Sequence, residues 1–175
     1  MEAARPALPS DAPAVTDLAR TAVGELGLLR GGPVWQLQDA RVEPIDEGVA
    51  ADIDRDVALG LTVVGTIDGT VVGYGVSRLE TLTDGSVLAE VSDLYVDPGA
   101  RGVGLGEAMM DLLVAHAQEA GAIGIDALAL PGDRETKNFF ETFGLKARAI
   151  VVHRSLRATE VPQVPPVPGG DDGGS

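Results

Sequence analysis

The sequence predicts an α/β domain in which a mixed sheet packs against helices. Three stretches of the 175 residues carry this prediction. Residues 61–76 place two runs of β-branched residues on either side of Asp68-Gly69, which is the strongest short signal for a hairpin. Residues 15–29 repeat apolar side chains at helical spacing. Residues 90–107 read as a strand, a tight glycine-rich loop and the start of a helix.

The other elements follow from turn and capping residues. Residues 31–35, with Gly-Gly-Pro and the only Trp, predict a loop between the first two helices. The expected order is a strand at 5–8, a helix at 11–29, that loop, a helix at 45–57, the hairpin with its second strand reaching 82, a strand at 87–96, a helix at 105–121, a strand at 122–130, a helix at 135–143 closed by Gly144, and a last strand region at 145–156.

Composition sets the domain organisation and excludes several classes of protein. Residues 1–157 suit one folded domain, whereas residues 158–175 are rich in Pro, Gly and Asp and predict a disordered tail. No run of 18 apolar residues predicts a membrane span, and the N-terminus does not resemble a signal peptide. The chain has no cysteine and two histidines, so we expect no disulfide, no metal site and a cytoplasmic location.

The net charge of −14 argues against nucleic acid as a partner, because phosphate backbones are bound by clustered lysines and arginines. Only two lysines are present. An acidic surface would steer a cationic substrate toward the protein, and solubility is an equally good explanation of the acidity.

The loop at 101–106 has the composition of an anion site. Arg101 and the glycines at 102, 104 and 106 lie between a strand and a helical apolar pattern. Each glycine costs about 0.5–1 kcal/mol relative to alanine inside a helix, so stability does not explain three of them. Bare backbone amides at a helix N-terminus bind anions, and Arg101 adds a cation. A Rossmann loop would need glycine where Glu107 stands, and the Gly-Lys-Ser/Thr of a Walker loop is absent.

The full string resembles the acetyl-CoA signature of the GNAT N-acetyltransferase superfamily. In that family an Arg/Gln-x-x-Gly-x-Gly/Ala loop follows a strand that ends in a Leu-Tyr-Val-like triplet and a proline. Arg101, Gly104 and Gly106 fill the signature, after residues 94–98. The resemblance covers roughly residues 5–156. It implies a central, mixed but mostly antiparallel sheet flanked by about four helices.

The resemblance also implies a function, namely transfer of an acetyl group from acetyl-CoA to a primary amine on a small molecule, a protein lysine or an N-terminus. The alternative is a GNAT-fold module that binds acyl-CoA with weak or no catalysis. A homodimer is an open alternative to a monomer. The cofactor contacts implied by the family are Leu94, Tyr95, Val96, Arg101, Gly102, Val103, Gly104, Leu105, Gly106, Asn138 and Phe140.

Two acidic residues on the strand before the loop are candidates for the general base. Glu90 is the first, because its place six residues before Val96 matches that of a catalytic Glu in several family members. Alternation predicts that Glu90 shares a face with Ser92, Leu94 and Val96. Asp93 is the second candidate, and a chain of waters is the third reading.

Residues 133–145 depart from the family's second motif. Asp133 stands where many members have Asn, and Phe140 replaces a Tyr whose hydroxyl often protonates the CoA thiolate. Phe140 cannot donate a proton, so water, another hydroxyl or an unprotonated thiolate must serve. Asn138 is an alternative source of the lost amide. Trp35 and Tyr74 suit either an acceptor pocket or the core, and His116 suits the edge of the core.

Overall fold

The computed structural model describes residues 1–156. Its sheet has five strands in the order β1-β2-β3-β4-β5; neighbouring strands are antiparallel except for β4 and β5, which are parallel. The predicted mixed, mostly antiparallel sheet is therefore confirmed. The elements are β1 (Glu2–Pro6), α1 (Ala12–Gly27), α2 (Gly32–Gln38), α3 (Ile45–Ile53), β2 (Gly60–Ile67), β3 (Thr70–Thr81), β4 (Val87–Val96), α4 (Leu105–Glu119), β5 (Gly124–Ala127) and α5 (Arg134–Thr142), with 3-10 turns at Pro9–Asp11 and Pro98–Ala100.

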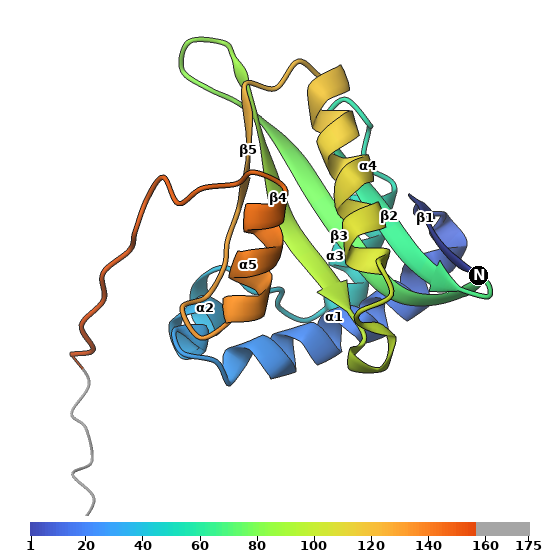
Figure 1. Cartoon of the computed structure of the whole chain (residues 1–175), viewed down its shortest axis with the longest axis horizontal. Coiled ribbons are helices and arrows are strands. Elements are labelled where there is room, and N and C mark those ends of the chain that lie inside the picture. Colours follow the sequence, from blue (N-terminus) through green and yellow to red (C-terminus); the bar gives the residue numbers. More distant parts are fainter. Residues whose placement is uncertain (157–175) are drawn as a thin grey trace, which may run out of the picture.

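Helices cover both faces of the sheet (Figure 1), and each face has its own apolar core. α1 and α3 pack on one face around Val15, Ala19, Ala22, Ile45, Val49, Val64, Tyr74, Val76 and Tyr95. α4 and α5 pack on the other around Val63, Val91, Met109, Met110, Leu113 and Phe140. Adjacent Val63 and Val64 belong to different cores because successive strand residues point to opposite faces.

α4 approaches the sheet closely because glycines on β2 and β3 leave room for its methionine. A Cβ atom added at Gly73 would lie 3.0 Å from Met109 Cε, and one added at Gly65 would lie 3.3 Å from Met109 Sδ. Met109 itself is completely buried. These glycines therefore set the distance between the sheet and the helix that begins at the glycine-rich loop.

The hairpin between β2 and β3 forms as predicted. Asp68 and Gly69 both have positive φ, at 49° and 82°, as a two-residue type I′ turn requires. The helix at 134–142 and the left-handed Gly144 after it are confirmed as well, with φ of 81° at Gly144.

Two predictions around the second helix are wrong. Residues 32–38 form α2 rather than a loop, since Pro33 lies in the first turn, where a missing N–H costs nothing. The helix predicted at 45–57 ends at Ile53, and the chain then turns at Asp56, whose side chain accepts a hydrogen bond from Ala58 N at 2.9 Å.

The last predicted strand is also wrong within the described residues, because 145–156 contain no strand. The β-branched run at Ile150, Val151 and Val152 is 83–91% exposed and pairs with no strand of the described sheet. β5 is shorter than predicted, at Gly124–Ala127. The expected tail at 158–175 lies outside the described residues. No helix in residues 1–156 is long and apolar enough to cross a membrane.

Candidate active site

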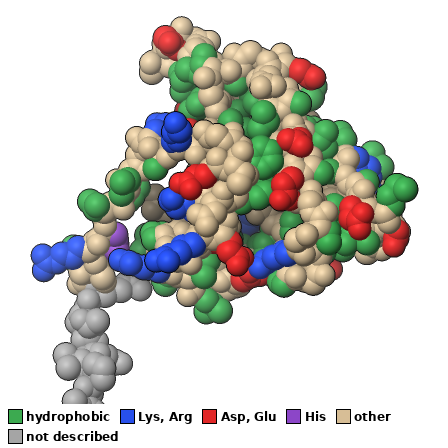
Figure 2. Space-filling view, viewed as in Figure 1, with side chains coloured by type: hydrophobic (Ala, Val, Ile, Leu, Met, Phe, Trp, Pro, Cys, Tyr) green, Lys and Arg blue, Asp and Glu red, His purple; other side chains and the backbone are tan. Residues whose placement is uncertain are grey.

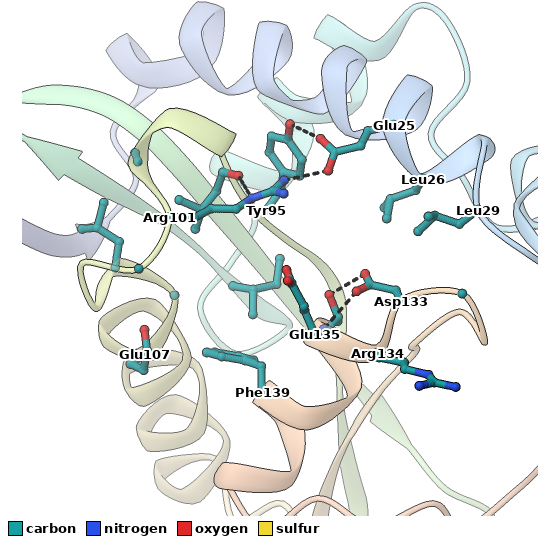
Figure 3. A pocket seen from close by; sticks show the side chains of 18 residues that line it. Glu25, Leu26, Leu29, Tyr95, Arg101, Glu107, Asp133, Arg134, Glu135 and Phe139 are labelled. Atoms are coloured by element: carbon teal, nitrogen blue, oxygen red, sulfur yellow. Dashed lines mark hydrogen bonds and ion pairs between the residues drawn. The ribbon is translucent and has the colours of Figure 1, made fainter.

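A cavity of about 600 Å³ lies between the C-terminal part of β4, the loop that leads into α4, the last turns of α1, and the start of α5 (Figure 3). Seven of the predicted cofactor contacts line it, namely Leu94, Tyr95, Val96, Arg101, Gly102, Leu105 and Gly106. Val103, Gly104, Asn138 and Phe140, which were also predicted, are not among the lining residues.

The glycine-rich loop has the backbone that its sequence predicts. Gly102 and Gly104 have φ of 82° and 87°, in the left-handed region that favours glycine. A Cβ atom at either position would meet no atom within 4 Å, so the loop backbone is uncovered. The first intrahelical bond of α4 runs from Ala108 N to Gly104 O at 3.0 Å. The N–H groups before Ala108 therefore have no partner inside the helix, which is the arrangement of an anion site.

β4 offers a free backbone edge beside this loop. β5 pairs with β4 only from Leu88↔Gly124 to Val91↔Ala127, whereas β3 pairs with β4 as far as Val96. The two parallel neighbours then diverge (Figure 1). Within residues 1–156, no strand pairs with residues 92–96 on the β5 side. Their backbone groups there are available to an extended ligand, except for Val96 O, which accepts from Arg101 Nε.

Arg101 is held by three contacts on the wall of the cavity (Figure 3). Its Nε donates to Val96 O at 2.9 Å, its Nη2 donates to Glu25 Oε1 at 2.8 Å, and its guanidinium lies 5.4 Å from the centre of the Tyr95 ring. The Tyr95 hydroxyl donates to Glu25 Oε2 at 2.8 Å. Burial raises the pKa of Tyr95 to about 12, and the bond to Glu25 acts in the same direction. Tyr95 is therefore a protonated donor at neutral pH.

No sequence pattern pointed to Glu25, because one acidic residue on the polar side of a helix belongs to no motif. Its place beside Arg101 arises only when the last turns of α1 fold over the end of β4. The expected role of Arg101 as a cation for the bound anion remains a prediction.

α5 presents a different aromatic residue to the cavity from the one predicted. Phe139 lines the cavity, and its ring would lie 3.3 Å from a Cβ atom at Gly106. Phe140 is 7% exposed and belongs to the core beneath α4. Asn138 is exposed, and Asp133 caps α5 by accepting from Thr136 N at 3.0 Å. The register of the family's second motif placed Phe140 at the site, whereas the helix turns Phe139 toward the cavity.

Phe140→Tyr is expected to lower the melting temperature without raising activity. The added hydroxyl would enter the core beside Met109 and Leu113, and an unpaired buried hydroxyl costs about 1–3 kcal/mol. Phe139→Tyr is the matched control, because its hydroxyl would face the cavity and should leave the melting temperature nearly unchanged. Thermal unfolding of both variants tests this placement. A stable Phe140→Tyr variant with a faster turnover would show that position 140 reaches the reacting atoms.

A β-bulge interrupts β4 next to the predicted base. Val76 of β3 pairs with Asp93, but the next residue, Ser77, pairs with Val91. Ser92 is therefore an extra residue on β4, and the alternation of side chains is inverted across it.

The bulge changes the face to which Glu90 belongs. Val91 and Leu94 both pack against the core under α4, although an uninterrupted strand would place them on opposite faces. Glu90, the neighbour of Val91, therefore lies on the face of Asp93. The prediction that Glu90 shares a face with Leu94 and Val96 is wrong for this reason. Glu90 is exposed and does not line the cavity.

Asp93 is occupied by hydrogen bonds on both oxygens. Arg41 donates from Nε to Oδ1 at 2.7 Å and from Nη2 to Oδ2 at 3.0 Å. The Tyr74 hydroxyl reaches Oδ1 at 3.0 Å, and Ser92 Oγ reaches Oδ2 at 2.9 Å. These bonds favour a positioning role for Asp93 over proton transfer, because its lone pairs are already engaged.

Arg41 extends this cluster to α3 and was not identified from the sequence. Its Nη2 also donates to Asp52 Oδ2 at 2.6 Å, and Arg55 and Arg78 pair with the other oxygen of Asp52. Burial acts to raise the pKa of Asp52, but the hydrogen bonds from Arg41 and Arg55 outweigh it and hold that pKa below 3.8. We call Arg41, Asp52, Arg55, Arg78 and Asp93 the charge network.

The remaining candidates have structural roles in this fold. Tyr74 is 1% exposed, and burial raises its pKa well above 10.0, with Asp93 as the next cause. His116 is buried, and its Nε2 lies 2.7 Å from Val57 O, as expected for the edge of the core. Trp35 lies on α2 and does not line the cavity. Residues 1–156 contain no group of three or more acidic or histidine side chains suited to a metal ion.

Comparison with known families agrees with the fold and the loop. A profile described as the Acetyltransferase (GNAT) family matches residues 33–145, which is more than half of the chain. The protein therefore belongs to the GNAT family of acetyltransferases, and the family predicted from the loop signature is confirmed. No curated protein sequence matches the chain.

Solved structures share the fold at low sequence identity. An acetyltransferase from Trypanosoma brucei superposes with a TM-score of 0.61 at 20% identity, covering 89% of this chain and 100% of that one. A ribosomal-protein-alanine N-acetyltransferase from Brucella melitensis gives 0.64 at 16%, covering 89% and 100%. A glucosamine-6-phosphate N-acetyltransferase from Arabidopsis thaliana gives 0.65 at 16%, covering 90% and 99%.

Proposed function

We propose that this protein is an acetyl-CoA-dependent N-acetyltransferase that acts on a primary amine by direct attack on the thioester. The observation that supports this most strongly is that the free edge of β4 and the amide-lined start of α4 face one cavity. The edge suits the amide groups of a pantetheine arm, and the loop suits the phosphates of CoA.

The reaction needs few chemical groups beyond this binding. The amine nitrogen attacks the thioester carbonyl carbon, an oxyanion forms, the C–S bond breaks, and the departing thiolate takes up a proton. Holding the two reactants in line supplies much of the rate. We assign stabilisation of the oxyanion to a backbone N–H on the β4 edge, with Leu94 as the first candidate.

Glu90 is our first candidate for the group that removes the amine proton. It lies on β4, in register with Arg78 of β3 and Asp126 of β5, and its side chain is exposed. Because Glu90 lies outside the cavity, we infer that it acts through water.

Glu90→Gln should lower kcat/KM about tenfold at pH 7, less than a directly placed base would contribute, because water provides a parallel route. The loss should shrink as the pH rises and more free amine becomes available. Glu80→Gln is the matched control, since it makes the same change at an exposed position of β3. Equal rates for wild type and Glu90→Gln between pH 6 and 9 would remove Glu90 from the mechanism.

The acceptor is best sought among cationic amines. Figure 2 shows acidic side chains spread over the face that carries α4, and Lys and Arg side chains gathered toward α5 and the segment after it. The net charge of −14 would attract an ammonium group. Structurally similar enzymes are named for a ribosomal protein, glucosamine 6-phosphate and aminoglycosides as acceptors, so an acceptor panel should include peptides, amino sugars and polyamines.

The test is release of the CoA thiol from acetyl-CoA in the presence of that panel. Because the chain has no cysteine, a thiol reagent reports released CoA without a protein background. Amine-dependent release supports an enzyme. The second candidate is a module that only binds acyl-CoA. It is favoured because neither Phe139, which lines the cavity, nor Phe140 carries a hydroxyl that could protonate the thiolate. Tight acetyl-CoA binding with no release for any amine would select that alternative.

A further inference from the structure

The contact between Glu25 and Arg101 has a consequence for ligand binding, provided that the proposed function holds. Arg101 is the cation of the glycine-rich loop, yet its guanidinium donates to the Glu25 carboxylate at 2.8 Å. Both side chains are partly exposed, at 42% and 37%, so a ligand in the cavity can reach them.

The charges around the cavity make this contact significant. Glu25, Glu107, Asp133 and Glu135 line the cavity, against Arg101 and Arg134. In Figure 3 the side chain of Arg134 extends away from Arg101 and Glu25. Among the described lining residues, Arg101 is thus the cation nearest the loop amides, and it already has an anionic partner.

We propose that Glu25 is a positioning residue that holds Arg101 against α1 and releases it to the phosphate groups of the acyl donor when the donor binds. A phosphate offers a guanidinium the same paired acceptor oxygens as a carboxylate. The phosphate and the Glu25 carboxylate therefore compete for the same N–H donors of Arg101. Glu25 keeps its second partner, the Tyr95 hydroxyl, during the exchange. Affinity for the donor is therefore set below the value that the loop and Arg101 would give without Glu25.

Glu25→Gln should consequently bind acetyl-CoA more tightly than the wild type. We expect about a tenfold lower Kd by isothermal titration calorimetry, equivalent to about 1.4 kcal/mol. A purely supporting role of Glu25 would give the opposite sign, because loss of the two hydrogen bonds would loosen the cavity wall. Glu135→Gln is the charge-matched control, since it removes a carboxylate from the same cavity without freeing Arg101, and its Kd should change less than about threefold.

Two further measurements separate the exchange from a general charge effect. In an Arg101→Gln background, adding Glu25→Gln should give no gain in affinity, because the competed group is absent. The affinity of S-acetylpantetheine, which carries no phosphate, should be the same for wild type and Glu25→Gln.

The results distinguish failure of this inference from failure of the proposed function. If the wild type binds acetyl-CoA and Glu25→Gln binds it equally or more weakly, the exchange is wrong and the function stands. Equal gains for Glu25→Gln and Glu135→Gln also overturn the exchange. If neither the wild type nor Glu25→Gln binds acetyl-CoA while both show normal melting curves, the proposed function fails, and the exchange fails with it.

Discussion

Gly106→Glu is expected to weaken acetyl-CoA binding by about 100-fold, equivalent to about 2.8 kcal/mol. Gly106 lies in the first turn of α4, lines the cavity, and has no positive φ, so a side chain there does not strain the backbone. A Cβ atom at this position would point toward Phe139, which lines the same cavity. A carboxylate would therefore enter the space between α4 and α5 beside the free amides, where it would take the place of a phosphate.

Gly106→Ala is the matched control, because it adds the same Cβ atom without the charge. The Phe139 ring, 3.3 Å from that atom, would have to move by a few tenths of an ångström. We expect less than about a threefold change in Kd for the alanine variant. Calorimetric titration gives both affinities, and circular dichroism checks the fold. Unchanged affinity in a folded Gly106→Glu protein would rule out the start of α4 as the phosphate site.

Arg41→Ala is expected to lower the free energy of unfolding by about 3–5 kcal/mol, the range for removing one partner of a buried ion pair. The side chains of Arg41, Asp52 and Asp93 are only 13%, 3% and 14% exposed. Removing the guanidinium leaves Asp93 without its paired donors and takes one of three arginines from Asp52. Urea unfolding of both proteins measures the difference.

Arg20→Ala is the control for a surface pair. Arg20 and Glu43 are 46% and 60% exposed, so solvent screens their pair and its loss should change the free energy of unfolding very little. A comparable loss in the two variants would contradict the assignment of the charge network as a buried stabilising cluster.

The network also gives a pH dependence. The pKa of Asp52 is lower in the folded state than its ordinary value of 3.8. The contribution of ionised Asp52 to the free energy of unfolding is therefore complete above pH 3.8. It is lost as the pH falls through the lower pKa of the folded state. Arg41→Ala should show a weaker loss of stability in that acid range, because the proton is then taken up at a less strongly perturbed carboxyl.

Local patterns were enough to predict most of the fold and the glycine-rich loop. Asp68-Gly69 fixes its hairpin through backbone conformation alone, and Arg101 with its glycines lies between a strand and a helix as the sequence indicates. These features depend on residues adjacent in the chain. The family membership followed from the same string and is confirmed by the match to residues 33–145.

The rest depends on contacts between distant segments. Glu25 is 76 residues from Arg101, and Arg41 is 52 residues from Asp93, so no local pattern relates them. The sequence around Ser92 contains no glycine or proline that would predict a bulge, yet the bulge reverses the face assigned to Glu90. For α5, spacing predicted the helix but not which of its two adjacent phenylalanines enters the core.

The close packing of Met109 against Gly65 and Gly73 bears on how the protein could be redesigned. The layer under α4 has no room for a side chain at Gly73, where a Cβ atom would lie 3.0 Å from both Met109 Cε and the Tyr95 carbonyl oxygen. The opposite layer has a buried core as well, and Arg41 joins α3 to β4 there through hydrogen bonds. We therefore expect side chains larger than glycine at Gly65 or Gly73 to displace α4 from the sheet, whereas substitutions at exposed positions of α1 to α3 should leave the fold intact.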